Sequence, residues 1–182
     1  MTCALIVGGR DGLSAALATA LGSAVRVPAS LREAVGAAVN AERLVLLPAA
    51  SAVDGWPAVR PALDLCFDTV QAAWPAMLQR GFGRIVIVVP ALCLAGRSDM
   101  PGAAVATALQ GLVKVLAQEG GRHGITANLL AVATADDRTP MPPVGRAGAD
   151  EDVARAVAFL CADSAEFLTG SALVVDGGLT MR

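Results

Sequence analysis

The stretch CALIVGGRDGLSAALATAL, residues 3–21, decides the fold of this chain. A short apolar run, Cys3–Val7, ends at two glycines, and from Gly12 to Leu21 apolar residues recur at helical spacing. A run of this length predicts a buried strand, and paired glycines predict a turn. The opening therefore predicts a strand, a glycine turn and a helix, which is how a βαβ unit begins.

The same alternation continues to the end of the chain. We expect further strands at 24–27, 43–47, 84–89, 125–132 and 171–175. We expect further helices at 31–40, 61–79, about 102–119 and 150–161, the last with Asp150 as its N-cap. The strand at 84–89 is the most strongly apolar, which places it at the centre of the sheet. Strands alternating with helices predict an α/β fold with a parallel sheet.

Composition limits the domain count and the class of partner. With 182 residues, the chain is expected to form one domain over residues 1–182. Hydrophobic residues make up 55% and charged residues 16%, which excludes disorder and predicts apolar surface that meets another subunit. The net charge is −2 and the basic residues are scattered singly, so we expect no nucleic-acid partner and no binding to anionic lipid.

Membrane and metal sites are also not expected. The longest nearly unbroken apolar run, 85–95, is shorter than a spanning helix requires, and the first residues make a poor secretory signal, so a cytoplasmic location is predicted. The cysteines form no pair at metal-ligand spacing, and we interpret them as reduced core residues; they are Cys3, Cys66, Cys93 and Cys161.

Four stretches resemble the short-chain dehydrogenase/reductase family, and within it the 3-oxoacyl reductases. They are ALIVGGRDGLSAALA at 4–18, GRIVIVV at 83–89, ALQGLVKVLAQEGGRHGITANLLA at 108–131 and PVGRAGADEDVARAVAFLCADSAEFLTGSALVVDGG at 143–178. The last is the most specific, because several short segments occur in family order and spacing. The resemblance implies a Rossmann-like, doubly wound parallel sheet of about six strands, with a dinucleotide at the first helix N-terminus. The third-strand region and the substrate lid are shortened here.

The cofactor turn that the resemblance implies is degenerate. The family pattern T-G-x-x-x-G-x-G falls on residues 7–14, where Gly8 and Gly12 survive and Ser14 replaces the third glycine. The second strand ends without the acidic residue that would bind a ribose hydroxyl, and only residues 31–40 separate it from the next strand. We therefore expect binding of NAD or NADP to be lost or weak, and we predict no cofactor.

The catalytic positions implied by the resemblance are also replaced. The family's serine position falls on Pro90 or its neighbour Val89. The tyrosine and lysine positions fall on Gly102 and Ala106, and the chain contains no tyrosine. A phenol near pKa 10 needs a fixed positive charge beside it to act at neutral pH, so both functions are expected to be absent. Ser51 with Asp54, or Ser98 with Asp99, lacks a histidine and is interpreted as turn capping. His123 is predicted to face solvent, and Asn128 to be structural.

These features predict a non-catalytic pseudoenzyme that serves as a structural or regulatory subunit. The expected partner is a second copy of this chain or an active family member, and the resemblance implies a ketoreductase or hydroxyacyl dehydrogenase. In the family the helices corresponding to 61–79 and 102–119 pair between subunits, and the candidate anchors there are Leu65, Trp74, Leu109 and Leu116. Two alternatives remain open: a cyclase- or lyase-type enzyme in the old cleft, and a small-ligand module built on Gly8–Gly12.

Overall fold

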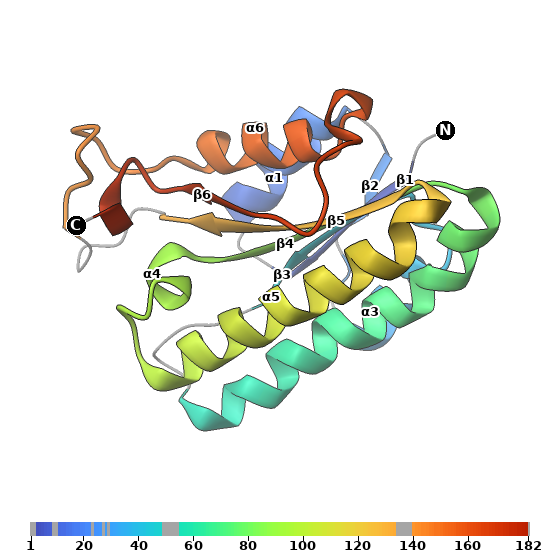
Figure 1. The fold of residues 1–182 in the computed structure, drawn as a ribbon, viewed down its shortest axis with the longest axis horizontal. Coiled ribbons are helices and arrows are strands. Elements are labelled where there is room, and N and C mark those ends of the chain that lie inside the picture. Colours follow the sequence, from blue (N-terminus) through green and yellow to red (C-terminus); the bar gives the residue numbers. More distant parts are fainter. Residues whose placement is uncertain are drawn as a thin grey trace.

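A six-stranded parallel sheet forms the centre of the molecule (Figure 1). The computed structural model describes all residues except 1, 2, 9, 10, 23, 27, 29, 49–54, 134–139 and 182. The strand order is β2-β1-β3-β4-β5-β6, and every neighbouring pair is parallel. The strands are β1 (Cys3–Gly8), β2 (Ala24–Arg26), β3 (Arg43–Leu47), β4 (Gly83–Pro90), β5 (Ile125–Val132) and β6 (Ala172–Val175). The α/β prediction, with about six strands, is confirmed.

Helices cover both faces of this sheet (Figure 1). One layer consists of α1 (Asp11–Leu21) and α6 (Asp150–Leu160). The other consists of α2 (Leu31–Ala38), α3 (Val59–Arg80), the short α4 (Ala91–Leu94) and α5 (Met100–Gly120). The doubly wound architecture follows from this arrangement, because the central strands β4 and β5 bury both of their faces.

Burial along β4 shows why its sequence is continuously apolar. Ile85, Ile87 and Val89 point into the core formed with α2, α3 and α5. Val86 and Val88, between them, point into the core formed with α1 and α6. Since successive side chains of a strand point to opposite faces, a strand covered on both sides needs apolar residues at every position. The prediction that this strand lies at the middle of the sheet is confirmed by the strand order.

Some predicted boundaries are wrong. The helix predicted at 61–79 is α3, which extends two residues earlier and one later, and α6 ends at Leu160 instead of Cys161. The N-cap of α6 is Ala149, not Asp150, because the carboxylate of Asp152 turns back and accepts a hydrogen bond from the Ala149 N–H at 3.0 Å. The Asp152 carboxylate thus supplies the acceptor at the start of the helix that an N-cap side chain usually supplies. The predicted end of the second strand, Val27, lies outside the described residues.

Helix α5 is apolar because it packs on the sheet. Among the described residues, the helical segment Met100–His123 is the one helix long and apolar enough to cross a membrane. Its apolar stripe includes Val105, Leu109, Val113 and Leu116, which are buried against the strands. Packing of one face of the helix on a sheet accounts for this composition.

Asn128 joins β5 to the segment that precedes β6. Its side-chain Nδ2 donates to the Leu168 carbonyl oxygen at 2.8 Å, and its Oδ1 accepts from the Ser171 N–H at 3.2 Å. The residue is buried, so both bonds replace contacts with water. The prediction of a structural asparagine is confirmed.

Three of the four cysteines and the single histidine have side chains in the described part of the structure. Cys66, Cys93 and Cys161 are buried and form no disulfide, and burial raises the pKa of the thiols of Cys66 and Cys161 to about 12. The side chain of Cys3 lies outside the described part. His123 is half-buried and accepts a hydrogen bond from Arg122 Nε at 3.2 Å. No group of metal-ligating side chains gathers within the described ranges.

Candidate functional site

The glycine turn after β1 is required by backbone packing. Gly8 has φ +81°, in the left-handed region, and a β-carbon there would overlap the carbonyl oxygen of Leu47 at the end of β3. Residues 8 and 47 are partners in the parallel register of the two strands. Only glycine has both the conformational freedom and the small volume that this position needs. Gly8 is therefore explained by the sheet itself, without a ligand.

The first turn of α1 is occupied from the side by an acidic group. A β-carbon on Gly12 would lie 2.8 Å from Asp150 Oδ2, at the start of α6. Ser14, two residues further along α1, is half-buried. The N-terminus of a helix attracts anions, so a carboxylate at this turn competes with any phosphate that approaches it.

The positions predicted to correspond to catalytic residues are closed. Pro90 ends β4, pairs with Val132 across the sheet and leads directly into α4. Gly102 and Ala106 are both buried on the face of α5 that points to the sheet. These positions hold no group that could donate or accept a proton from its side chain.

A cysteine and an aspartate fill the space beside Gly102. A β-carbon on Gly102 would lie 2.8 Å from Cys93 Sγ and 2.9 Å from Asp99 Oδ1. Asp99 is the N-cap of α5, and its Oδ1 accepts from the Gly102 N–H at 2.6 Å. This confirms the capping interpretation of Asp99, whereas Ser51 and Asp54 lie outside the described residues.

The thiol at this place is not an activated nucleophile. Burial raises the pKa of Cys93, the Asp99 carboxylate raises it further, and a hydrogen bond with Ser98 lowers it. An ordinary thiol is already mostly protonated at neutral pH, and the net shift makes the thiolate rarer still. Cys93, Ser98 and Asp99 therefore form a packed helix start rather than a catalytic group.

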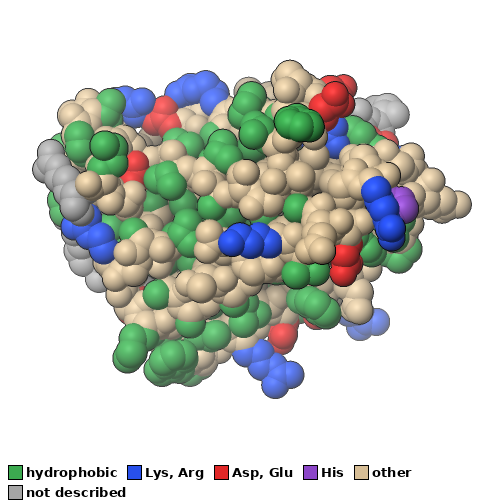
Figure 2. All heavy atoms as spheres, in the orientation of Figure 1, with side chains coloured by type: hydrophobic (Ala, Val, Ile, Leu, Met, Phe, Trp, Pro, Cys, Tyr) green, Lys and Arg blue, Asp and Glu red, His purple; other side chains and the backbone are tan. Residues whose placement is uncertain are grey.

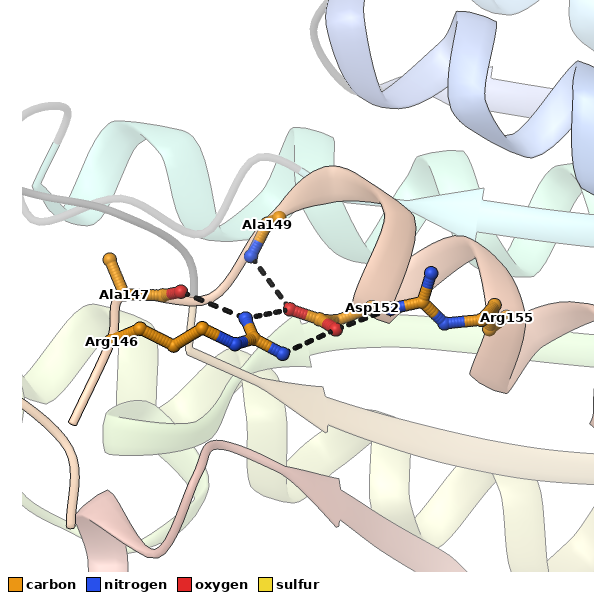
Figure 3. Close-up of polar contacts among 5 residues, drawn as sticks. All are labelled: Arg146, Ala147, Ala149, Asp152 and Arg155. Carbon is orange, nitrogen blue, oxygen red and sulfur yellow. Dashed lines mark hydrogen bonds and ion pairs between the residues drawn. The ribbon is translucent and has the colours of Figure 1, made fainter. Parts of the chain in front are cut away.

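Two arginines share one carboxylate at the start of α6 (Figure 3). Arg146 donates from Nη1 to Asp152 Oδ2 at 2.6 Å and from Nη2 to Oδ1 at 3.0 Å. Arg155 donates from Nη2 to Oδ1 at 2.6 Å, and the figure shows it approaching from the side opposite Arg146. The hydrogen bonds from Arg146 contribute most to holding the pKa of Asp152 well below its usual range. We call these three residues the Arg146–Asp152–Arg155 cluster.

The cluster lies at the rim of a cavity of about 190 Å³ at the carboxyl ends of β5 and β6. Its lining includes Ala133, Val175 and Gly177 from the ends of the two strands, and Pro142 and Val144 from the segment before α6. The Val144 N–H donates to the Gly177 carbonyl oxygen at 3.2 Å, which fastens that segment to the turn after β6. The cavity shares no lining residue with the positions at Gly8, Gly12, Ser14, Pro90, Gly102 or Ala106.

Comparison with known proteins places this architecture in a family. The family model described as enoyl-(acyl carrier protein) reductase matches residues 62–180. The chain belongs to the short-chain dehydrogenase/reductase family. It is 34% identical over 142 residues to the Thauera aromatica protein named (2S)-[(R)-hydroxy(phenyl)methyl]succinyl-CoA dehydrogenase subunit BbsC, covering 72% of this chain and 57% of that protein. It is 37% identical over 127 residues to acetoacetyl-CoA reductase of Rhizobium meliloti, covering 62% and 53%.

Other short-chain dehydrogenases/reductases give the same result. The 3-oxoacyl-[acyl-carrier-protein] reductase of Escherichia coli is 34% identical over 133 residues, covering 65% of this chain and 54% of that enzyme. The solved structure of the TT0495 protein from Thermus thermophilus superimposes with a TM-score of 0.84 at 28% identity and covers both chains fully. The alignments with the three curated relatives, in contrast, cover 53–57% of each relative. The chain therefore spans little more than half the length of these proteins.

The predicted interface anchors within this family fold divide into two groups. Leu109 and Leu116 are buried on the chain's own sheet, with 1% and 6% of their surface exposed. The prediction that these two residues are surface anchors is wrong, because the apolar stripe of α5 packs into the chain's own core. Leu65 and Trp74 are half-buried and pack against the same core. The exposed large apolar side chains on α3 and α5 are instead Phe67, Met100 and Val115.

Sequence reasoning also missed the Arg146–Asp152–Arg155 cluster. The segment RAGADEDVAR carries the signal: an acid at the third position of a helix caps its start, and an arginine three residues later lies on the same face. The contact between Cys93 and Gly102 could not be predicted from a local sequence pattern, because 9 positions and a helix boundary separate the two residues.

Proposed function

We propose that this short-chain dehydrogenase/reductase is a non-catalytic subunit that assembles with a second chain of the same fold. One observation carries the proposal: the space beside Gly102, where the family resemblance puts the catalytic tyrosine, is filled by Cys93 and Asp99. Proton transfer needs a group of suitable pKa within hydrogen-bond reach of the substrate. Gly102 and Ala106 supply none, and no tyrosine occurs elsewhere in the chain.

The outer face of α3 and α5 supports assembly. Phe67 is 55% exposed and Val115 is 50% exposed, so each presents a large apolar surface to water. Three of the exposed positions on α5 are small, namely Ala104, Ala108 and Gly111, and a β-carbon on Gly111 would meet nothing within 4 Å. Small residues let a second helix approach closely, and the apolar side chains flank that approach.

Charge on this side of the molecule is sparse, as Figure 2 shows. Few charged side chains lie over α3 and α5 in this view, and hydrophobic atoms gather at the lower left, where these two helices begin. Trp56 and Met100 are 60% and 73% exposed at those two helix starts. Depletion of charge with exposed aromatic and Met side chains is typical of the core of a subunit interface.

The partner is proposed to be a catalytically complete relative. The three curated relatives compared above are named as dehydrogenases or reductases of acyl thioesters, which suggests a ketoreductase or hydroxyacyl dehydrogenase as the partner. A mixed complex is favoured over a homodimer because loss of the proton-transfer groups has no cost when the other subunit supplies them. A two-fold symmetric contact allows both the homodimer and the mixed complex, since a diverged chain of the same fold can replace one of the two subunits.

Affinity purification from the native host, followed by light scattering, tests this function. The tagged chain should elute in a complex of defined mass with a short-chain dehydrogenase that retains tyrosine and lysine, and Phe67→Glu should release that partner. Val39→Glu is the matched control, because Val39 is also exposed but lies after α2. A tagged chain that is a monomer with no bound relative would contradict the proposal.

A further inference from the structure

The cavity beside the Arg146–Asp152–Arg155 cluster combines apolar residues with charged ones. Pro142, Val144, Val153 and Val175 line it together with the two arginines and the carboxylates Asp152 and Asp176. Known ligand sites place a few polar groups on a mostly apolar concave surface in this way. At about 190 Å³ the cavity is smaller than sites for drug-sized ligands, and it would hold a volume equal to about six water molecules.

The carboxylates near the cavity are already satisfied by the protein. Both oxygens of Asp152 accept two hydrogen bonds each, from the arginines and the Ala149 N–H. Asp176 accepts from the Gly178 N–H, the Thr180 N–H and the Thr180 hydroxyl, which turn it toward its own loop. These two acids therefore have little capacity left to bind a cation in the cavity.

The arginines, in contrast, have donors left. Arg155 makes one hydrogen bond in the part of the chain that the structure describes, to Asp152, and a guanidinium carries five N–H groups. Two guanidinium groups and two carboxylates, those of Asp152 and Asp176, line the cavity, so their formal charges balance, and the guanidinium N–H groups that are not bonded to Asp152 are what the cavity offers to an anion. The hydrogen bonds to Asp152 also fix both arginine side chains in place, so an incoming anion would not have to order them.

We propose that this cavity binds a small molecule that carries one anionic group, a carboxylate or a phosphate, on a short apolar chain. The anionic group accepts hydrogen bonds from Arg155 and from the outer edge of Arg146, and the apolar chain contacts Val144, Val153 and Val175. This inference does not depend on the subunit function, because the cavity shares no residue with the outer face of α3 and α5.

Nuclear magnetic resonance titration of valine methyl groups tests the site with hexanoate, hexyl phosphate and hexanol as probes. Hexanoate or hexyl phosphate should shift the methyl signals of Val144, Val153 and Val175 in a saturable way. The tighter of the two anions identifies the head group that the arginines prefer. Hexanol, which has the chain but no charge, should bind at least about tenfold more weakly, because hydrogen bonds to charged groups are stronger.

Two variants and one control separate the cavity from non-specific binding. Arg155→Met should reduce the affinity for the anionic probe about tenfold or more, while Arg146 and the Ala149 N–H still hold Asp152. Ala133→Leu should reduce binding of every probe by filling the cavity. Lys114→Met, which removes an exposed charge on α5, should change nothing. An unchanged thermal midpoint verifies that each variant is folded.

The proposal is overturned by any of three results. These are the absence of a saturable shift with both anions, equal affinity for hexanol and the anions, or unchanged affinity in folded Arg155→Met.

Discussion

The Sγ atom of Cys93 lies 2.8 Å from the point where a β-carbon on Gly102 would stand. The two residues belong to different helices, α4 and α5, and both are buried. Real β-carbons do not come this close to another non-bonded heavy atom. The packing at the start of α5 therefore requires a residue without a side chain at position 102. A larger residue there would have to displace Cys93 and the capping carboxylate of Asp99 together.

Gly102→Ala should therefore destabilise the protein by about 1–3 kcal/mol, the usual cost of overpacking. The matched control is Gly36→Ala, since Gly36 lies exposed in α2 and a β-carbon there meets nothing within 4 Å. That control should stabilise by about 0.5–1 kcal/mol, because alanine favours a helix over glycine. Chemical denaturation measures both free energies of unfolding. Equal stabilisation by the two substitutions would show that Cys93 does not fill the position.

Gly12 and Asp150 should be coupled energetically. Gly12→Ala brings a β-carbon within 2.8 Å of Asp150 Oδ2, so it should stabilise α1 less in the native chain than in an Asp150→Ala background. Residues in direct contact typically show interaction free energies of about 0.5–3 kcal/mol. A double-mutant cycle by denaturation measures this value and cancels the other effects of changing Asp150. Additive free energies would mean that the carboxylate does not lie over the first turn of α1.

Phe67→Glu should shift the molecular mass measured by light scattering from that of an oligomer to that of one chain. The physical reason is that a charge at the centre of an apolar contact is left without a partner and without water. Phe67 is 55% exposed in the isolated chain, so the substitution should leave the thermal midpoint nearly unchanged. Val39→Glu should leave the mass as it is. Dissociation by both variants would indicate a general loss of structure instead of a specific interface.

Asp152 should make the stability of the folded chain depend on pH in the acid range. Because its pKa is lowered in the folded state, chiefly by hydrogen bonds from Arg146, the carboxylate stabilises the fold above its unfolded pKa of about 3.9, and this contribution is lost as the pH falls toward the folded pKa. Asp152→Asn should thus lower the thermal midpoint at pH 7, and its difference from the native chain should shrink below about pH 4. A difference that stays constant from pH 7 to pH 2.5 would exclude the carboxylate as the cause.

Much of the fold could be predicted from sequence because β4 and β5 are covered on both faces, which makes their apolar runs unambiguous. The glycine positions could also be predicted, but their reasons could not. Gly8 avoids the carbonyl of Leu47, and Gly12 avoids Asp150, which is 138 residues away in sequence. Contacts of this kind have no local pattern.

The interface anchors show the limit of helical spacing. The periodic stripe of α5 identified Leu109 and Leu116, yet a stripe marks only the face that is buried, and here the chain's own sheet buries it. Exposed residues such as Phe67 and Val115 interrupt the pattern and so were not selected. The Arg146–Asp152–Arg155 cluster was missed because Asp150 seemed the natural N-cap, while the acid that caps α6 is two residues further on.

The proposed absence of hydride transfer is tested most directly by following cofactor absorbance with a large amount of the purified chain, NADH or NADPH, and acetoacetyl-CoA as an acyl-thioester ketone. We expect no oxidation above that of buffer, both for the native chain and for the variant with Gly102→Tyr and Ala106→Lys, because Cys93 and Asp99 occupy the space beside Gly102 and catalysis needs every group in place at once. Saturable oxidation of either cofactor by the native chain would contradict it.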